Sequence, residues 1–217
     1  MPRNNRQNKR GRRDEHILNK KHKRSEGSLV KGVPRGHRAV VGIHSVKEAL
    51  KVNSDNIRKL FLRKDWEQNP ELAQLQQLAK SKNVSCEFRP DGFLDNIALT
   101  HQGVAAYVEG HPSFDEQQLE KDGPCVLMAL DGIEDPHNLG AIMRTAWLLG
   151  VKGLFIPENR ATGITPAAAK VACGAAEYVA VERKSNLPQF IGELKEKGFW
   201  IYGLAGQAKQ ELWQVEF

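Results

Sequence analysis

The chain has few cysteines, and none is placed as a structural metal site or a disulfide framework requires. Its 217 residues include three, Cys86, Cys125 and Cys173. No two of them have C-x-x-C spacing, so the sequence supports neither a zinc site nor a disulfide framework, and we expect no bound metal. The pattern fits a reducing compartment, and we therefore expect a cytoplasmic protein.

Long apolar runs and nucleotide-binding loops are also lacking. No apolar run approaches the ~18 residues that a membrane span needs, so we expect no membrane partner. The N-terminus is basic without an apolar stretch, which excludes a secretory signal. No G-x-G-x-x-G follows a predicted strand and no P-loop occurs, so a Rossmann dinucleotide enzyme or an NTPase has no motif in its favour.

Positive charge is abundant and is concentrated at the N-terminus. The formal net charge is +6, and residues 1–38 hold 13 Lys and Arg against 3 Asp and Glu, which leaves the remainder mildly acidic. This segment has too few large apolar residues to offset the entropy of ordering. We interpret it as a disordered tail that attracts RNA by releasing counterions. The residues assigned to RNA there are Arg10, Arg12, Arg13, Lys20 and Lys21.

Two other interpretations of the tail stay open. It could serve only to keep the protein in solution, or it could be an organelle transit peptide. Its richness in Arg and Lys permits a transit peptide, whereas Asp14, Glu15 and the scarcity of serine argue against one. RNA attraction is favoured because the rest of the chain points to an RNA substrate.

Residues 39–110 have the pattern of a small α/β domain. Leu72, Leu75, Leu78 and Ala79 recur at helical spacing after Pro70, which suits a first helical turn. We predict helices at 43–51, 70–82 and 90–97, and strands at 40–42, 59–63, 84–89 and 103–109. Residues 111–123 are polar and include a proline, so they are the expected linker.

Residues 124–217 alternate strands with helices, which predicts a second domain with a mostly parallel sheet. Strands are expected at 125–130, 151–156, 178–182 and 199–204, and helices at 139–149, 165–171 and 187–197. The apolar run at 126–130 suits a strand that is buried on both faces.

The stretch from Leu130 to Gly150 organises this second half. It is predicted to be a strand end, a polar turn with Asn138 as N-cap, and a helix whose only charge is Arg144. A helix that is apolar on nearly every side is normally buried, and a buried guanidinium needs a partner. The sequence therefore indicates an anion site beyond the carboxyl end of a parallel strand. A structural carboxylate is an equally good partner for Arg144 on this information.

The motif Asp135-Pro136-His137-Asn138-Leu139-Gly140-Ala141, followed by Arg144-Thr145-Ala146, resembles the first signature motif of the SpoU (TrmH-type) RNA 2′-O-ribose methyltransferases of the SPOUT superfamily. The run from Lys170 to Glu177 fits the same family. The resemblance extends from about Val40 to the last residue. It is closest to the branch that methylates a guanosine ribose in bacterial 23S ribosomal RNA.

This resemblance implies an L30e-like N-terminal substrate-binding domain (39–110) and a mostly parallel α/β SPOUT domain (124–217), which is knotted in the family. It implies S-adenosyl-L-methionine as cofactor, ribosomal RNA as partner and a homodimer for the full-length parent. Arg144 would bind an RNA phosphate or the ribose oxygen and stabilise developing charge. Asn138 would hydrogen-bond in the same pocket, and a plain helix cap is compatible with that role.

The weaker assignments concern RNA and cofactor contacts. The segments Gly42–Val46 and His101–Val104 resemble the beginning and the end of the family's substrate-binding domain. Within them, His44 and His101 would contact RNA, although local structural hydrogen bonding explains such histidines as well. Leu204, Ala205 and Gly206 follow a predicted strand end and would approach the cofactor. A glycine-bounded turn explains them equally.

The sequence departs from the family after this point. Two further family motifs, a Gly-Ser/Ala-Glu-Gly turn and an Ile-Pro…Ser-Leu-Asn-Val stretch, do not occur before the last residues, Glu211–Phe217. We therefore expect a truncated copy of an enzyme, with an incomplete knot and cofactor pocket. Two other classes stay open: a non-catalytic RNA-binding protein with a degenerate second domain, and an unrelated α/β enzyme with an anionic substrate.

Overall fold

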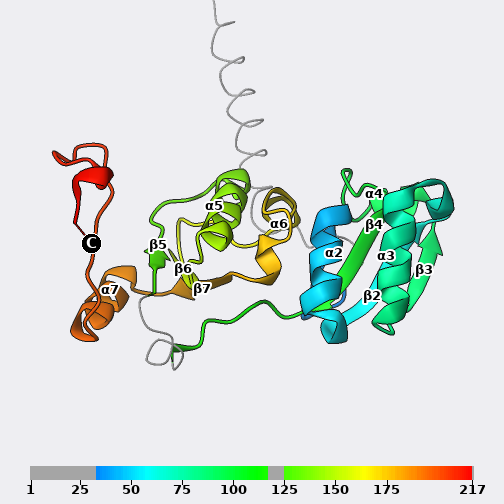
Figure 1. Cartoon of the computed structure of the whole chain (residues 1–217), viewed down its shortest axis with the longest axis horizontal. Coiled ribbons are helices and arrows are strands. Elements are labelled where there is room, and N and C mark those ends of the chain that lie inside the picture. The colour runs from blue at the N-terminus through cyan, green and yellow to red at the C-terminus, as the bar shows by residue number, and fades with distance from the viewer. Residues whose placement is uncertain (1–32, 117–124, 217) are drawn as a thin grey trace, which may run out of the picture.

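The computed structural model describes residues 33–116 and 125–216, which form two lobes side by side (Figure 1). We call residues 33–110 the N-terminal lobe and residues 125–199 the C-terminal lobe. In the described ranges, no helix is long and apolar enough to cross a membrane. The N-terminal lobe contains β1 (His37–Val41), α2 (Ile43–Val52), η1 (Ser54–Asn56), β2 (Ile57–Arg63), η2 (Trp66–Gln68), α3 (Pro70–Ser81), β3 (Cys86–Arg89), α4 (Asp91–Asp95) and β4 (Val104–Glu109).

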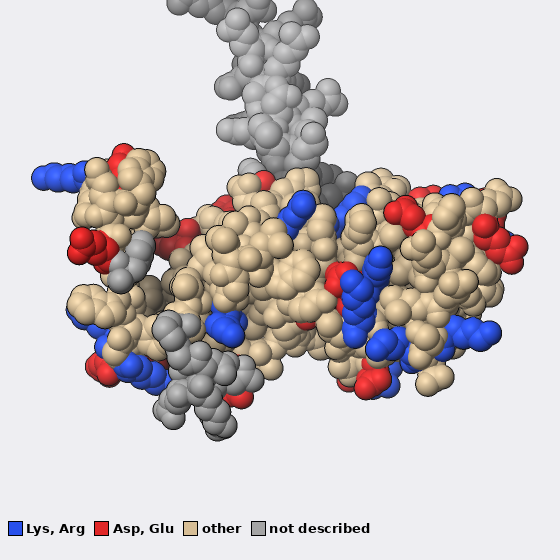
Figure 2. Space-filling model, viewed as in Figure 1, with Lys and Arg blue, Asp and Glu red and all other residues tan. Residues whose placement is uncertain are grey.

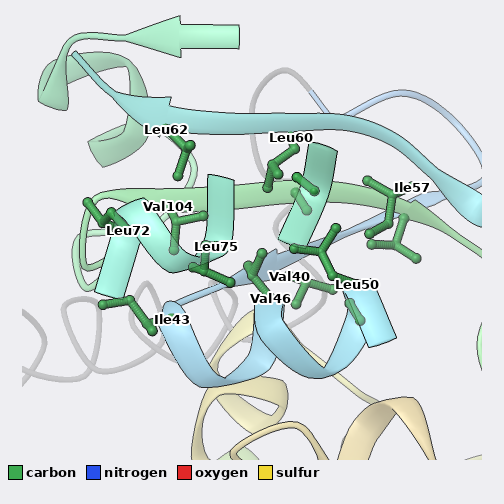
Figure 3. Packing of buried hydrophobic residues seen from close by; sticks show 14 residues of the cluster. Val40, Ile43, Val46, Leu50, Ile57, Leu60, Leu62, Leu72, Leu75 and Val104 are labelled. Carbon is green, nitrogen blue, oxygen red and sulfur yellow. The ribbon is translucent and has the colours of Figure 1, made fainter. Parts of the chain in front are cut away.

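The N-terminal lobe is a mixed four-stranded sheet between two helical layers. The strand order is β1-β4-β2-β3, and only β2 and β3 are parallel. Successive residues of a strand face opposite sides, so β4 serves two cores. Val104 and Val108 pack with α2 and α3 (Figure 3), whereas Tyr107 packs on the other face with Leu94 and Ile97, at α4. The predicted helices and strands of this lobe are present, with bounds that shift by one to a few residues.

The helix α3 follows directly from its sequence signals. The Asn69 side chain caps it by accepting hydrogen bonds from the backbone amides of Glu71 and Leu72, and Pro70 occupies the first turn. Leu72, at the predicted spacing, is completely buried in the core against the sheet. Burial of a leucine of this kind contributes roughly 1.5–3 kcal/mol to folding. Because of this gain, the apolar residues at helical spacing correctly predicted which face of α3 packs against the sheet.

The C-terminal lobe is a parallel sheet, as predicted, and helices cover both of its faces. Its elements are β5 (Leu127–Ala129), α5 (Pro136–Leu148), β6 (Gly153–Pro157), α6 (Pro166–Val171), η4 (Ala175–Glu177), β7 (Ala180–Lys184) and α7 (Leu187–Glu196), and η5 (Leu212–Gln214) follows it. The strand order is β5-β6-β7. On β6, Leu154 and Ile156 pack with α5 and α6, whereas Phe155 packs with α7.

Three predictions for the helices and strands of this lobe are wrong. The helix α5 begins at Pro136, and the side chain of Asp135 accepts a hydrogen bond from the His137 amide, so Asp135 and not Asn138 is the N-cap. Residues 199–204 form no strand, and Trp200 and Leu204 are 85% and 75% exposed. The strand β5 is a half-exposed edge strand and is not buried on both faces.

The helices α5 and α6 approach each other closely at Gly140. A Cβ at this position would lie 2.5 Å from the backbone oxygen of Ala168 and 2.8 Å from the Cβ of Val171. Because the nearest atom belongs to the backbone, no side-chain rotation can relieve that contact. The glycine therefore sets the distance between the two helices.

We expect Gly140→Ala to lower the free energy of unfolding by about 1–3 kcal/mol, because the added methyl forces the two helices apart. Gly192→Ala is the matched control: Gly192 is also helical, and a Cβ added there would meet nothing within 4 Å. That change should stabilise the chain by about 0.5–1 kcal/mol. Urea denaturation of both variants measures the difference, and equal midpoints would contradict the packing argument.

Candidate functional site

The two motif residues with assigned chemistry, Asn138 and Arg144, lie on α5 and are both exposed. The helix buries only one face, through Leu139, Gly140, Met143 and Ala146. The prediction of a buried guanidinium is therefore wrong, because the small and polar residues of the motif leave the other face in solvent. An exposed Arg144 needs no structural carboxylate and is accessible to an external anion.

Arg144 contacts one residue of the neighbouring turn. Its Nη1 atom lies 3.8 Å from the Sγ atom of Cys173, which accepts a weak hydrogen bond. Cys173 and Gly174 have φ angles of 51° and 97°, so the chain reverses there in two left-handed residues between α6 and η4. Glycine tolerates this backbone at no steric cost, which explains its place in the run Lys170–Glu177.

An aromatic pair continues the site toward the N-terminal lobe. Trp147, one helical turn after Arg144, stacks on Tyr178 with ring centroids 4.6 Å apart and an interplanar angle of 17°. The Tyr178 hydroxyl donates a hydrogen bond of 2.6 Å to the carboxylate of Glu48 on α2. Burial, and then this hydrogen bond, raise the pKa of Tyr178 to about 12, so the phenol stays protonated and keeps donating at neutral pH.

The histidines assigned to RNA have different environments. His44 is exposed at the start of α2, and a Cβ on Gly174 would lie 3.7 Å from its backbone oxygen. His101 is only 8% exposed: its Nδ1 accepts from the Gly103 amide, and its Nε2 lies 3.2 Å from an Asp95 carboxylate oxygen. This is the local structural role that the sequence left open, and RNA contact by either residue stays a prediction.

The remaining predicted residues are not brought to this site by any described contact. Arg10, Arg12, Arg13, Lys20 and Lys21 lie outside the described residues. Leu204, Ala205 and Gly206 are exposed on the segment that follows α7, which runs away from the sheet in Figure 1. Among the described residues, this exposed segment does not enclose a cofactor site, and the assignment of Leu204, Ala205 and Gly206 to S-adenosylmethionine stays a prediction.

Charges of both signs are interspersed on the face shown in Figure 2, and they do not form one basic patch there. Several charges of the described residues are paired: Arg58 lies 2.6 Å from Glu109, and Lys59 pairs with Glu87. Within the described ranges, no group of three or more His, Cys, Asp or Glu could hold a metal ion. Residues 39–217 hold 19 Lys and Arg against 23 Asp and Glu, so they offer little net attraction for a polyanion.

Sequence reasoning missed the residues that surround Arg144. Cys173 and Tyr178 come from the turn after α6, and Glu48 comes from α2, 96 positions before Arg144. Gly174 inside an otherwise apolar run was a turn signal. The partnership with Glu48 had no local signal, because it depends on how the two lobes pack.

Two α/β lobes, with a motif-bearing helix after the first parallel strand, are the architecture that the family resemblance implied. Two family models match the chain: "RNA 2'-O ribose methyltransferase substrate binding" over residues 39–114, and "SpoU rRNA Methylase family" over residues 125–217. The chain belongs to the SpoU rRNA methylase family.

Individual relatives agree with this membership. A Staphylococcus haemolyticus protein, named as a TrmH family tRNA/rRNA methyltransferase, is 39% identical over 170 residues, which are 76% of this chain and 68% of the relative. The 23S rRNA (guanosine-2'-O-)-methyltransferase RlmB of Shewanella oneidensis is 38% identical over 184 residues, 82% of this chain and 74% of that protein.

Solved structures support the fold. The SpoU methyltransferase AviRb from Streptomyces viridochromogenes, crystallised in complex with AdoMet, matches with a TM-score of 0.60 at 19% identity. The match covers 75% of this chain and 61% of that structure, so the chain spans less than two thirds of its length. At this identity the match establishes the fold alone, and that fold agrees with the predicted α/β class.

We expect Glu48→Gln to lower the pKa of Tyr178 from about 12 toward the ordinary value near 10, because the neighbouring carboxylate disfavours the phenolate. Since the pKa is raised in the folded state, the stability from this pair is present below pH ~10 and is lost as the pH rises through ~12. NMR titration of 13C-labelled tyrosine follows each ring separately. An unchanged Tyr178 titration would contradict the hydrogen bond.

Proposed function

We propose that the whole protein transfers the methyl group of S-adenosylmethionine to a ribose 2′-hydroxyl of RNA, at a guanosine of 23S ribosomal RNA. The observation that carries the proposal is an exposed Arg144 within the complete first motif of a chain that belongs to the SpoU family. The named activity of the 38% identical RlmB supports the finer choice of substrate. Ribosomal RNA in the cytoplasm is then the partner, and a homodimer is the proposed assembly.

The chemistry requires that a hydroxyl lose its proton while a methyl group approaches its oxygen in line. Arg144 is suited to hold the substrate, because its planar fork can donate two hydrogen bonds to a phosphate or stabilise charge on the ribose oxygen. It is presented on the helix α5, and its Nη1 atom lies 3.8 Å from Sγ of Cys173. Asn138, exposed in the first turn of the same helix, can hydrogen-bond to the same RNA.

The described residues supply no step for the cofactor. Leu204, Ala205 and Gly206 are exposed and do not enclose a site for S-adenosylmethionine. The proposal that the cofactor is used rests on family membership. The basic N-terminal segment, in turn, is proposed to add sequence-independent attraction for RNA, which the described lobes provide little of.

In the whole protein, we expect Arg144→Ala to lower the methylation rate by about two to three powers of ten, the usual effect of removing one donor to a developing oxyanion. Arg144→Lys should restore it only in part, because an ammonium lacks the planar fork. Since Arg144 is exposed, the free energy of unfolding should change by less than about 0.5 kcal/mol. Transfer of labelled methyl groups to unmodified ribosomal RNA, together with thermal unfolding, measures both.

Lys195→Ala is the matched control for this experiment. Lys195 is an exposed cation on α7 of the same lobe, and its loss should leave the rate near that of the wild type. An Arg144→Ala variant that melts early but turns over normally per folded molecule would sink the assignment of Arg144 to the reaction.

A second candidate, RNA binding without catalysis, is favoured by the exposed segment at 204–206. We expect the 217-residue chain to bind S-adenosylmethionine weakly, because Leu204, Ala205 and Gly206 are exposed. Calorimetric titration decides: a micromolar dissociation constant would contradict this expectation and would exclude the non-catalytic alternative. RNA binding without measurable cofactor binding would favour it for this chain.

A further inference from the structure

The two lobes are joined by a set of contacts that neither lobe needs for its own core. The helix α6 lies beside α2 and β1, and η4 lies beside α2 (Figure 1). Ser45 on α2 donates a buried hydrogen bond to the Ala169 oxygen at 3.3 Å. Lys170 donates to the Thr100 oxygen at 2.9 Å. The segment that contacts Arg144 through Cys173 therefore also contacts the N-terminal lobe.

The strongest of these contacts is the ion pair between Arg38 and Glu177. Arg38 lies on β1 and Glu177 on η4, 139 residues later. The guanidinium donates to both carboxylate oxygens, at 2.5 and 2.6 Å, and the two side chains are only 9% and 1% exposed. A bidentate pair fixes direction as well as distance, and a buried charge that loses its partner is strongly unfavourable.

Arg38 also holds the point where the chain leaves the N-terminal lobe. Its Nε atom donates a hydrogen bond of 2.6 Å to the backbone oxygen of Gly110, which has a left-handed φ of 71°. Four residues later, Phe114 packs edge-on against Phe155 of the C-terminal lobe, with ring centroids 5.0 Å apart. Only residues 111–113 therefore separate the anchor at Gly110 on one lobe from the anchor at Phe114 on the other.

Close packing between η4 and α2 also contributes to the interface between the two lobes. A Cβ at Gly174 would lie 2.5 Å from Cγ of Glu48, so η4 approaches α2 as closely as a glycine allows. The Tyr178–Glu48 hydrogen bond is adjacent. The Arg38–Glu177 ion pair, the Tyr178–Glu48 hydrogen bond and the close approach at Gly174 act together with the short connection 111–113. Together they select one relative orientation of the lobes.

We propose that Arg38 and Glu177 are positioning residues that clasp the two lobes together, so that RNA held by the N-terminal lobe is presented to Arg144. The proposal rests on the proposed function for the identity of the ligand, but the clasp itself does not. The turn at Cys173–Gly174 is the link, because it contacts Arg144 on one side and α2 on the other. Breaking the clasp leaves each core intact and frees the short connection 111–113.

The clasp is tested by the distance between spin labels on Gln77 of α3 and Glu196 of α7, both exposed, in the full chain. The three native cysteines are first replaced by serine. This cysteine-free background must have the same melting temperature as the wild type. We expect one narrow distance distribution for this background and for Arg58→Ala, which breaks an exposed pair within the N-terminal lobe. Arg38→Ala and Glu177→Gln should broaden the distribution severalfold.

A folded Arg38→Ala or Glu177→Gln protein with an unchanged distribution would overturn the proposal. If these variants do not fold, Arg38→Lys replaces them: it keeps the charge, loses the fork, and should broaden the distribution less but measurably. An unchanged distribution in Arg38→Lys would overturn the clasp equally. The double variant Arg38→Glu with Glu177→Arg exchanges the two charges. A narrow distance distribution in this variant supports the clasp.

The link to RNA is tested in the whole protein. Arg38→Lys should lower kcat for methylation of ribosomal RNA by roughly 10- to 100-fold, the range expected when reacting groups are misplaced, with the Kd for S-adenosylmethionine unchanged. A broadened distribution with unchanged kcat would overturn the positioning role. Absence of methylation by the wild type would instead contradict the proposed function, and the distance measurement, which needs no activity, would still decide on the clasp.

Discussion

The close approach of α5 to α6 at Gly140 is the constraint on which the arrangement of the site depends. Because a Cβ there would meet the backbone of α6, the two helices can pack at this distance only with a glycine. The same approach brings the turn after α6 beside Arg144, where Cys173 meets the guanidinium. It also directs η4 toward α2. One glycine in the motif thereby orders both the exposed arginine and the surface that meets the other lobe.

The packing of α5 on α6 matters for function because the turn after α6 also contacts the N-terminal lobe. Under the proposed function, the N-terminal lobe holds RNA and the C-terminal lobe carries Arg144, so one ribose has to be brought to one guanidinium. A flexible connection alone does this poorly. Here the connection is short, anchored by Phe114, and locked by a buried bidentate pair. Electrostatics are used for orientation more than for net stability, since a buried pair has to offset its own desolvation. The clasp that we propose is therefore specific in direction.

Much of the fold followed from the sequence, because hydrophobic period and caps act locally. Leu72 and its helical neighbours predicted the buried face of α3, and alternation of strands with helices predicted the parallel sheet of the C-terminal lobe. The motif around Asn138 and Arg144 identified the family, and the family models confirm it. The site residues themselves stay predictions.

The failures have physical causes. Asp135, two residues before His137, outcompeted Asn138 for the cap, so the helix begins earlier. Arg144 is exposed because alanine and threonine on its face do not demand burial. The apolar residues near Trp200 looked like a strand, but a strand forms only where a neighbour pairs with it. The Arg38–Glu177 pair had no sequence signal, since its partners are 139 residues apart.

The central claim is that Arg144 faces the RNA that the N-terminal lobe holds. Ultraviolet cross-linking of the chain to a fragment of ribosomal RNA, followed by mass spectrometry of the peptides, tests it most directly. The account predicts cross-links in the α5 peptide that carries Arg144 and in the peptide that begins α2 at His44, on the same RNA. Cross-links confined to residues 1–32, or to one lobe alone, would contradict it.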